Sequence, residues 1–585
     1  MQGTVTLTMI VRNEAANLEA CLNSVAGQVD EIIIVDTGST DNTREIARRY
    51  TDKLYNYAWN GDFSTARNFA LEQATSEWIL YLDADEQLAA GTGLVKDLIT
   101  GNNQDKQVEA FLLPLNNPTS DSTGQYNRFL VLRLFKNNGR YRFRGNIHEQ
   151  VVITENNVVD IAPGPVIKHK IITGKERNRK RGRNLALLKK ACTGDRENPF
   201  LQYYLGVEWM MLGKPQQALP HLRHAYRELT DINLLFRSPA LRYLVICLHA
   251  LGKIDEAISL CREAAERYPD YTDIYYLGGV LLEEKQEYQT AIEQFNRAVK
   301  CGTPPALYSH MHGTDSFLAY YHLGHCHEML GKTGVARDYY KQALDINPGH
   351  TYPVYNLFPL LLAKYGPVST LAYYRDKNFW KNIELAAISA NLFYIAGYPH
   401  LACRCLEGWG INIPEEIRFY LGKYNIYSGR LEEGLEYLSK IPEGNLYPEA
   451  QIHRVIACLL LGRYPEGRSL ALQLWKNPTT RCDTWLLLTL ARMMEKGEPV
   501  NFPRRVRGTD ILEPARKMYD FCSRYLPEAR GQKNSHCSQL VNGLESIIKN
   551  TSHQGYLALL EYFKDKSLIT RSLFDYKFGS GWNRI

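Results

Sequence analysis

Short apolar runs alternate with amphipathic segments over the N-terminal part of the chain. Four runs, residues 4–11, 31–36, 53–57 and 76–82, are rich in β-branched or aromatic residues, as expected of strands. Between them, apolar side chains recur with helical spacing over about 15–25, 43–50 and 62–75. This alternation predicts a mostly parallel sheet with helices on both faces.

Acidic side chains stand at the ends of two of these strands. The second strand ends in Asp36, and the fourth is followed by Asp83 and Asp85. In an open α/β sheet, ligands bind at the carboxyl ends of the strands. Carboxylate oxygens suit a divalent cation such as Mg²⁺ or Mn²⁺, which can in turn hold phosphates. A lone Asp-x-Asp is also explained by an exposed acidic turn that caps the next helix.

The pattern is less regular after residue 86. Residues 108–115 and 128–135 predict two further strands, and the polar loop 116–124 between them is able to move over a ligand. Residues 166–170 predict the last strand of the domain, which carries His169.

Four ordered segments resemble glycosyltransferase family 2: residues 8–14 (TMIVRNE), 34–43 (IVDTGSTDNT), 62–68 (DFSTARN) and 82–86 (LDADE). The resemblance covers roughly residues 1–170. It implies an α/β domain of the GT-A type, a Rossmann-like fold that binds nucleotide sugars. It also implies transfer of a sugar from a nucleotide donor, usually a UDP-sugar, with inversion at the anomeric carbon.

The resemblance places the donor beside side chains that follow the strands. It implies that Asn13, Glu14 and Asp36 hold the nucleoside, and that Asp36 accepts a hydrogen bond from the uracil N–H. Arg67 matches an arginine near the base and pyrophosphate; alternatively, it is a surface arginine on an amphipathic helix.

The Asp-x-Asp pair matches the metal motif of the family. The resemblance implies that Asp85 binds Mn²⁺ or Mg²⁺ directly and that Asp83 contacts the ribose or ordered water on the metal. We expect Asp85 on a solvent-facing loop past the strand. His169 matches a late histidine that completes the metal shell in several GT-A enzymes, but a surface histidine between two lysines is equally consistent. The metal would neutralise charge on the leaving UDP.

An inverting transfer needs a base that takes a proton from the attacking hydroxyl or thiol. Residues 143–150 (FRGNIHEQ) resemble the start of the acceptor half of the family's site. Glu149 is the first candidate for the base and His148 the second. The alternative is a hairpin in which His148 and Glu149 merely pair with each other.

Residues 175–184 (KERNRKRGRN) are the densest basic stretch of the chain. The simpler interpretation is a solvated helix start. The stretch could instead lie over the anionic donor site or contact an anionic acceptor. Aromatic side chains are not interleaved with it, which argues against a nucleic-acid patch.

From about residue 198 the chain repeats a helical pattern. Copies with a Tyr-rich first helix and small residues at regular places begin near residues 203, 243, 275 and 320, and weaker ones near 419 and 458. They resemble tetratricopeptide repeats, which implies an all-α superhelical solenoid with a concave face. We expect a catalytic domain at 1–172, a basic linker helix at 173–197, repeats at 198–350, degenerate helical repeats at 351–509 and a helical cap at 510–585.

Composition excludes some classes of protein. The 585 residues are 45% hydrophobic and 23% charged, with a net charge of +6 that permits an anionic ligand without arguing for nucleic acid. We expect no membrane-spanning segment and no signal peptide. The 12 cysteines lack paired metal-ligand spacing, which favours reduced thiols and a cytoplasmic protein.

These patterns lead to a main hypothesis and two alternatives. The main one is a cytoplasmic, metal-dependent, inverting glycosyltransferase whose protein or peptide acceptor is gripped by the concave face of the repeats. One alternative acts on a cell-envelope or lipid-linked saccharide and uses the repeats for assembly, for example as a homodimer. The other is a scaffold whose transferase domain is vestigial.

Overall fold

The computed structural model describes residues 3–100, 108–119, 124–153, 158–170, 174–377, 382–407, 413–474, 480–497 and 535–551, with a few positions between 514 and 522. The chain divides into two compact units, Met1–His350 and Thr351–Ile585. Most of the expected C-terminal cap and positions 120–123 of the polar loop lie outside the described residues.

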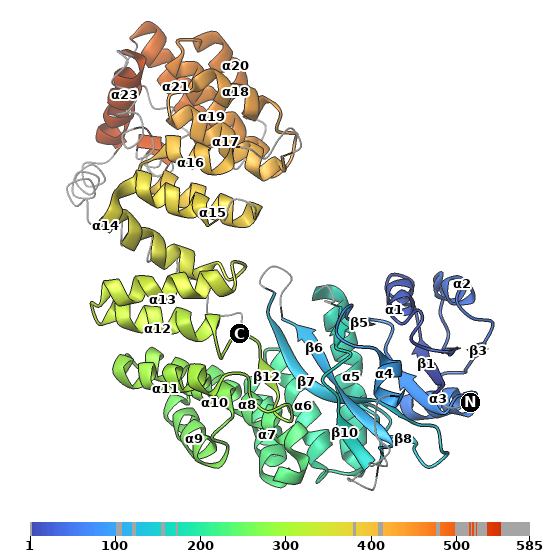
Figure 1. Cartoon of the computed structure of the whole chain (residues 1–585). Helices are drawn as coiled ribbons and strands as arrows, with labels where there is room; N and C mark the ends of the chain where they lie inside the picture. Colours follow the sequence, from blue (N-terminus) through green and yellow to red (C-terminus); the bar gives the residue numbers. More distant parts are fainter. Residues whose placement is uncertain are drawn as a thin grey trace. The chain divides into compact units, whose positions relative to one another are not determined.

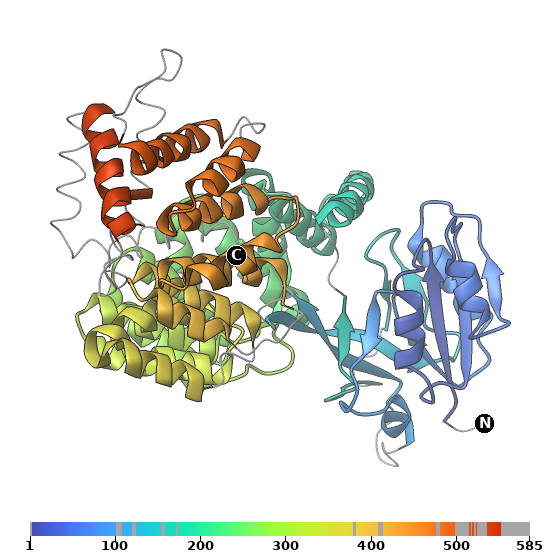
Figure 2. The ribbon, with the colours of Figure 1, turned by 90° about the horizontal axis from the view of Figure 1, so that it is seen from above.

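The first unit begins with a ten-stranded mixed sheet, which Figures 1 and 2 show as one twisted layer. Its main order is β3-β2-β1-β4-β7-β6-β11-β5, while β10 pairs with β6 and β12 with β7. The strands are β1 (Val5–Val11), β2 (Glu31–Asp36), β3 (Leu54–Asn56), β4 (Trp78–Tyr81), β5 (Glu86–Leu88), β6 (Ala110–Pro118), β7 (Tyr126–Lys136), β10 (Val159–Ile161), β11 (Ile167–His169) and β12 (His310–Met311).

Alternating side chains of the central strands enter cores on opposite faces of the sheet, as the period of two requires. Trp78 and Leu80 of β4 pack in the core that includes α1 and α2, whereas Ile79 and Tyr81 point to the other face. The helices of this domain are α1 (Leu18–Ser24), α2 (Thr43–Arg48), α3 (Phe63–Glu72) and α4 (Val95–Thr100). Figure 1 shows these helices around the strand layer.

The expected mostly parallel sheet is correct for the first four strands in spatial order and for the pairs that β6 makes with β10 and β11, but not around β7. β3, β2, β1 and β4 are parallel to their neighbours, but β7 runs antiparallel to both β4 and β6. The reason is local: β6 and β7 are joined by a short loop, and a short connection forces neighbouring strands to run in opposite directions. Two helices are also shorter than predicted. Helix α1 starts at Leu18 instead of about residue 15, and α3 ends at Glu72 instead of about residue 75.

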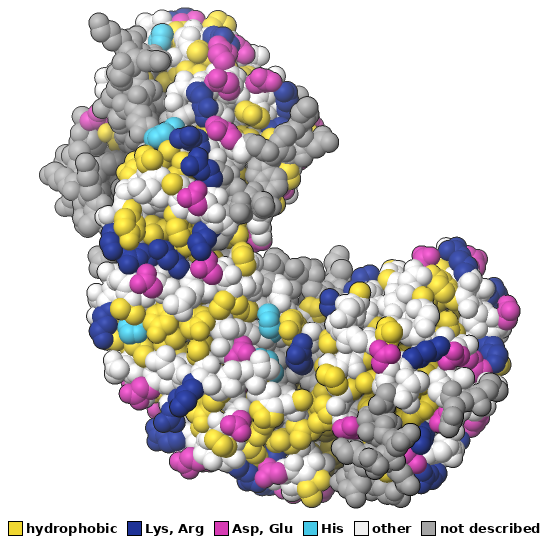
Figure 3. Space-filling view, viewed as in Figure 1, with side chains coloured by type: hydrophobic (Ala, Val, Ile, Leu, Met, Phe, Trp, Pro, Cys, Tyr) yellow, Lys and Arg dark blue, Asp and Glu magenta, His cyan; other side chains and the backbone are white. Residues whose placement is uncertain are grey.

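The segment around residues 143–151 is a hairpin, but His148 and Glu149 have other partners in it and do not form the pair that the alternative interpretation proposed. β8 (Phe143–Arg144) pairs antiparallel with β9 (Gln150–Val151). The basic stretch then lies in a long helix, α5 (Gly174–Gly194). On the face that Figure 3 shows, the coloured Lys and Arg side chains are interspersed with Asp and Glu and do not form one continuous basic surface.

Four helix pairs complete the first unit. They are α6 (Pro199–Met211) with α7 (Pro215–Glu228), α8 (Leu234–Ala250) with α9 (Ile254–Arg267), α10 (Thr272–Glu284) with α11 (Tyr288–Cys301), and α12 (Phe317–Met329) with α13 (Thr333–Ile346); a short 3₁₀ turn, Asp231–Asn233, precedes α8. A Cβ atom on Gly324 would lie 2.7 Å from the Tyr340 ring, so glycine permits this crossing. In the third pair the equivalent contact is at Gly279, against Phe295.

The second unit is entirely helical in its described residues. Its helices are α14 (Tyr352–Asp376, interrupted at Gly366), α15 (Ile383–Ile395), α16 (Pro399–Leu406), α17 (Glu415–Tyr427), α18 (Leu431–Ser439), α19 (Tyr447–Leu460), α20 (Tyr464–Leu474), α21 (Arg481–Lys496) and α23 (Ser535–Thr551). The fold is therefore an α/β domain followed by tetratricopeptide-like helices, as predicted. Across the described residues, none of the helices combines the length and apolarity needed to cross a bilayer.

One strand of the sheet comes from the repeats. β12 lies between α11 and α12 and pairs antiparallel with β7, where His310 is opposite Arg128. Asp273 of α10 holds this strand: its carboxylate accepts hydrogen bonds from His310 Nδ1 and the Met311 N–H, both at 2.9 Å. Asp273 is fully buried and also lies 3.5 Å from the guanidinium of Arg242. The helical repeats and the sheet are thus one structure within this unit.

We expect Asp273→Ala to lower the free energy of unfolding by about 3–5 kcal/mol, because it leaves the buried Arg242 without its carboxylate. Urea denaturation measures the loss, and hydrogen exchange should show faster exchange at Met311. The matched control is Asp255→Ala, whose side chain is 87% exposed and pairs with Lys285 at the surface; it should cost about 1 kcal/mol or less. Equal losses in the two variants would contradict the role given to Asp273.

Candidate active site

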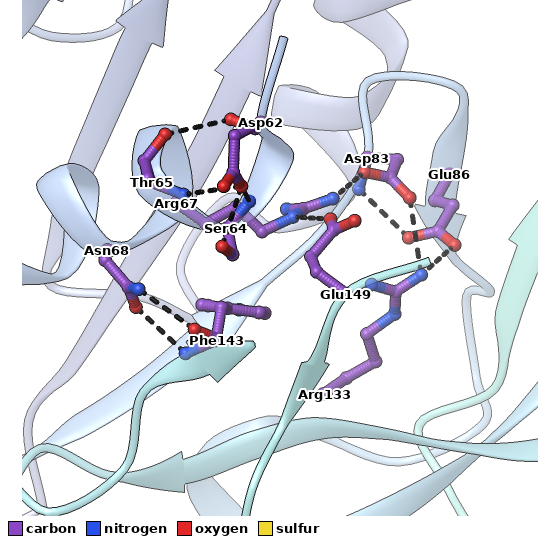
Figure 4. Close-up of polar contacts among 10 residues, drawn as sticks. All are labelled: Asp62, Ser64, Thr65, Arg67, Asn68, Asp83, Glu86, Arg133, Phe143 and Glu149. Carbon is purple, nitrogen blue, oxygen red and sulfur yellow. Dashed lines mark hydrogen bonds and ion pairs between the residues drawn. The ribbon is translucent and has the colours of Figure 1, made fainter. Parts of the chain in front are cut away.

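Helix α3 is fixed to its surroundings by polar side chains near its start (Figure 4). Asp62 caps the helix by accepting from the N–H groups of Ser64 and Thr65, at 2.8 and 3.3 Å. Asn68, one turn later, donates to the carbonyl of Phe143 and accepts from its N–H, so its amide binds β8 as a neighbouring strand would. These contacts hold α3 against the hairpin.

Arg67 lies between two carboxylates that come from distant parts of the chain. Its guanidinium donates to Asp83 Oδ1 at 2.5 Å and to Glu149 Oε1. Arg133 of β7 forms a second such contact, donating to Glu86 Oε1 at 2.5 Å and reaching Asp83 Oδ2 at 3.4 Å. Figure 4 shows the two guanidinium groups on either side of Asp83.

The ring of Tyr81 lies against both arginines. The Arg67 and Arg133 guanidinium carbons are 5.1 and 4.4 Å from its centre. Burial disfavours the charge on Asp83, but the guanidinium groups of Arg67 and Arg133 outweigh it and hold the pKa of Asp83 well below its usual range. With its pKa lowered in this way, Asp83 stays ionised at any physiological pH. For Glu86 the balance is reversed: burial raises its pKa, although Arg133 opposes that shift.

His148, which precedes Glu149 in the hairpin, does not pair with it. Its ring stacks on Tyr204 of α6, with the ring centres 3.8 Å apart and the planes 1° from parallel. Burial lowers the pKa of His148 to about 4. Its Nε2 atom is buried and has no hydrogen-bond partner among the described residues, and its backbone has φ of 52°. Such φ values are uncommon for non-glycine residues, so the surrounding contacts enforce this conformation.

The residues expected to hold the nucleoside lie in two connected loops. Asn13 Oδ1 accepts from the Thr40 N–H at 2.7 Å, and the Asn13 N–H donates to Ser39 Oγ at 3.0 Å. Asp36 Oδ1 accepts from both the N–H and the hydroxyl of Ser39, at 3.0 and 2.6 Å. The Asp36 side chain is buried, so in this structure it shapes the loop. A carboxylate has further lone pairs, and its contact with uracil stays a prediction.

Asp85 lies at the end of β4 together with the predicted late histidine. Its Oδ1 is 3.7 Å from His169 Nε2, and its Oδ2 is 3.3 Å from Lys180 Nζ of α5. His169 Nδ1 is 2.8 Å from the Lys170 carbonyl, so in the neutral ring Nδ1 carries the proton and Nε2 keeps its lone pair. Two ligands of one ion, each about 2.1 Å from it, can be up to about 4 Å apart, and Asp85 and His169 therefore fit a divalent cation.

The surroundings of Asp85 differ from the exposed loop that we expected. Its side chain is only 13% exposed, because His169 and Lys180 cover it. The acidic turn also caps no helix, since Glu86 begins strand β5. Within the described ranges, no group of three or more His, Cys, Asp or Glu side chains is arranged to hold a metal.

Sequence reasoning missed two members of the cluster, Glu86 and Arg133. One signal was available: Arg133 interrupts the apolar run of its strand, and a charge in a buried strand requires a partner. Of the basic stretch, Lys180 reaches the site, where it is 3.6 Å from Glu14 Oε1. The side chains of residues 175–179 lie outside the described residues.

Comparisons with known proteins find similarities to both the α/β domain and the helical repeats. Residues 6–154 match the model of Glycosyl transferase family 2, and residues 210–279 and 317–350 match Tetratricopeptide repeat models. The chain is 28% identical over 309 residues to the SPbeta prophage-derived glycosyltransferase SunS of Bacillus subtilis (strain 168), covering 49% of this chain and 69% of SunS.

Two other similarities are confined to parts of the chain. A TPR repeat-containing protein of Synechococcus elongatus is 40% identical over 187 residues, which is 30% of this chain and 44% of that protein. The chain thus spans less than half of that relative. Among solved structures, MamA matches with a TM-score of 0.25 and 21% identity, over 30% of this chain and 95% of MamA.

The buried, neutral His148 makes stability depend on pH. Its pKa is depressed from 6.5 in the unfolded chain to about 4, so its stabilising contribution is present above pH 6.5 and is lost as the pH falls towards 4. Between pH 7 and pH 5 we expect the wild type to lose about 2 kcal/mol more unfolding free energy than His148→Asn, which tolerates the same φ. Urea titrations at both pH values measure this.

The control for this experiment is His400→Asn, which changes an exposed histidine and should follow the wild type. A pH dependence in His148→Asn as steep as that of the wild type would show that His148 is not the titrating group.

Proposed function

Because the chain carries a family 2 glycosyltransferase domain followed by tetratricopeptide repeats, we propose that it is an inverting, metal-dependent enzyme that transfers a sugar from a UDP-sugar to a protein or peptide selected by the repeats. One observation carries the proposal. Arg67, Asp83 and Glu149 come from three separate segments and meet in one ion-paired cluster beside Asp85. This edge of the sheet, at the carboxyl end of β4, is where ligands of α/β folds bind.

Asp85 and His169 would hold the divalent cation. When bound, the cation supplies positive charge that stabilises the leaving nucleotide. Only two side chains fit this role among the described residues, so phosphate oxygens of the donor and water would complete the coordination. Arg67 and Arg133 keep Asp83 ionised and fixed in place, so that it can accept hydrogen bonds from the ribose or from water on the cation.

Glu149 remains our candidate for the base that accepts the proton of the acceptor. One of its oxygens, Oε1, accepts from Arg67, and a carboxylate offers about four lone-pair sites in all. The hairpin also presents Glu149 next to the repeats, because the preceding residue, His148, stacks on Tyr204 of α6. This contact supports a route by which an acceptor held by the repeats reaches the base.

The metal assignment predicts the behaviour of Asp85→Asn. The variant keeps the shape of the side chain and removes the charge, so hydrolysis of UDP-sugars should fall by about 100-fold or more and lose its stimulation by Mn²⁺. Turnover of the EDTA-treated protein, with and without Mn²⁺, measures both effects. Asp97→Asn, an exposed position on α4, is the control.

Near-wild-type turnover of Asp85→Asn at saturating donor would refute the metal role. Absence of hydrolysis and of transfer by the wild type, for every nucleotide sugar offered, would favour the scaffold alternative. Transfer to lipid-linked saccharides but to no protein or peptide would favour the cell-envelope alternative.

The role of Glu149 predicts a loss in the chemical step. Glu149→Gln should lower the rate of transfer to a hydroxyl acceptor by about 10²–10⁴ and remove the acid limb of the pH profile, with UDP affinity unchanged. If Glu149 only positions Arg67, UDP affinity should fall instead. Initial rates across pH and UDP binding by calorimetry separate the two roles. Glu72→Gln, exposed on the same helix as Arg67, is the control.

A further inference from the structure

Among the α5 side chains that the structure describes, Lys180 reaches the candidate active site. Its ammonium group lies 3.3 Å from Asp85 Oδ2 and 3.6 Å from Glu14 Oε1. Asp85 follows β4 and Glu14 follows β1, and these two strands are neighbours in the sheet. Lys180 therefore lies at the edge of the sheet where the proposed donor would bind. It also lies outside residues 6–154, which match the family model.

Neighbouring side chains fix the position of α5. Arg181 contacts Glu208 of α6 at 3.5 Å, and Arg183 lies over the ring of Phe63, 5.5 Å from its centre. Further along the helix, Leu188 is buried in a cluster with Ile147 of the hairpin. Because these contacts anchor the helix in the turns that follow Lys180, they fix the place at which Lys180 is presented.

The charges around Lys180 change when a donor binds. In this structure the ammonium of Lys180 contacts the carboxylates of both Asp85 and Glu14. A divalent cation on Asp85 would compete with Lys180 for that carboxylate, since both are positive and would lie within a few ångströms of each other. A diphosphate brought to the same edge offers anionic oxygens, which are strong partners for an ammonium.

We propose that Lys180 binds the diphosphate of the nucleotide donor, and that in the absence of donor it competes with the divalent cation for Asp85. This inference rests on the proposed function. Removing Lys180 should therefore have opposite effects on two ligands: weaker binding of the nucleotide and tighter binding of the metal alone.

The experiment uses calorimetry on the full chain with Mn²⁺ alone, and with UDP or uridine in the presence of Mn²⁺. Lys180→Met keeps the aliphatic stem and should weaken UDP binding about tenfold, leave uridine binding unchanged and tighten Mn²⁺ binding severalfold. Lys180→Arg keeps the charge and should retain most of the UDP affinity. Lys190→Met, at an exposed position of the same helix, should resemble the wild type for all three ligands.

Wild-type UDP affinity in Lys180→Met would overturn the inference, and so would an equal loss of uridine binding, because that loss points to a distorted nucleoside site. If the wild type binds neither UDP nor uridine, the proposed function fails, and this result is distinct from failure at Lys180 alone. Thermal denaturation of each variant confirms that the chain remains folded.

Discussion

The candidate site depends on burying two guanidinium groups among three carboxylates around the ring of Tyr81. Arg67 joins helix α3, the turn after β4 and the β8–β9 hairpin through Asp83 and Glu149, and Arg133 joins β7 to the same turn. Desolvation of so many charges is costly, and it is offset only while each charge has its partners. The cluster is therefore intolerant of change, and it holds four segments of the chain in one geometry.

The sequence predicted those parts of the site that depend on short segments. Asp36 ends β2 and Asp85 follows β4, and both strands flank β1 in the parallel part of the sheet, so the pattern of strands places both residues at the same edge. The hairpin was foreseen as an alternative, but the partner of Glu149 was not. Arg67 is 82 residues away from it, and no local pattern encodes which guanidinium meets which carboxylate.

In the helical part, too, periodic features could be predicted from the sequence and isolated long-range contacts could not. Small residues at the crossings of paired helices recur with the repeat, so Gly206 and Gly324 could be recognised as packing positions. The two-residue strand β12 has no periodicity of its own, and only tertiary contacts with β7 and Asp273 define it. Lys180 lies between these cases: its charge was visible in the sequence, but its target required the direction in which α5 leaves the sheet.

The pairing of β12 with β7 also bears on synthesis of the chain. Arg128 leaves the ribosome roughly 180 residues before His310, which corresponds to about 10–40 s at 5–20 residues per second. During that interval the end of β7 has no neighbour on one side. The polar side chains of Asn127 and Arg128 are of the kind that discourages unwanted pairing of an open strand edge. The last step in completing the ten-stranded sheet thus belongs to a segment translated well after the other strands.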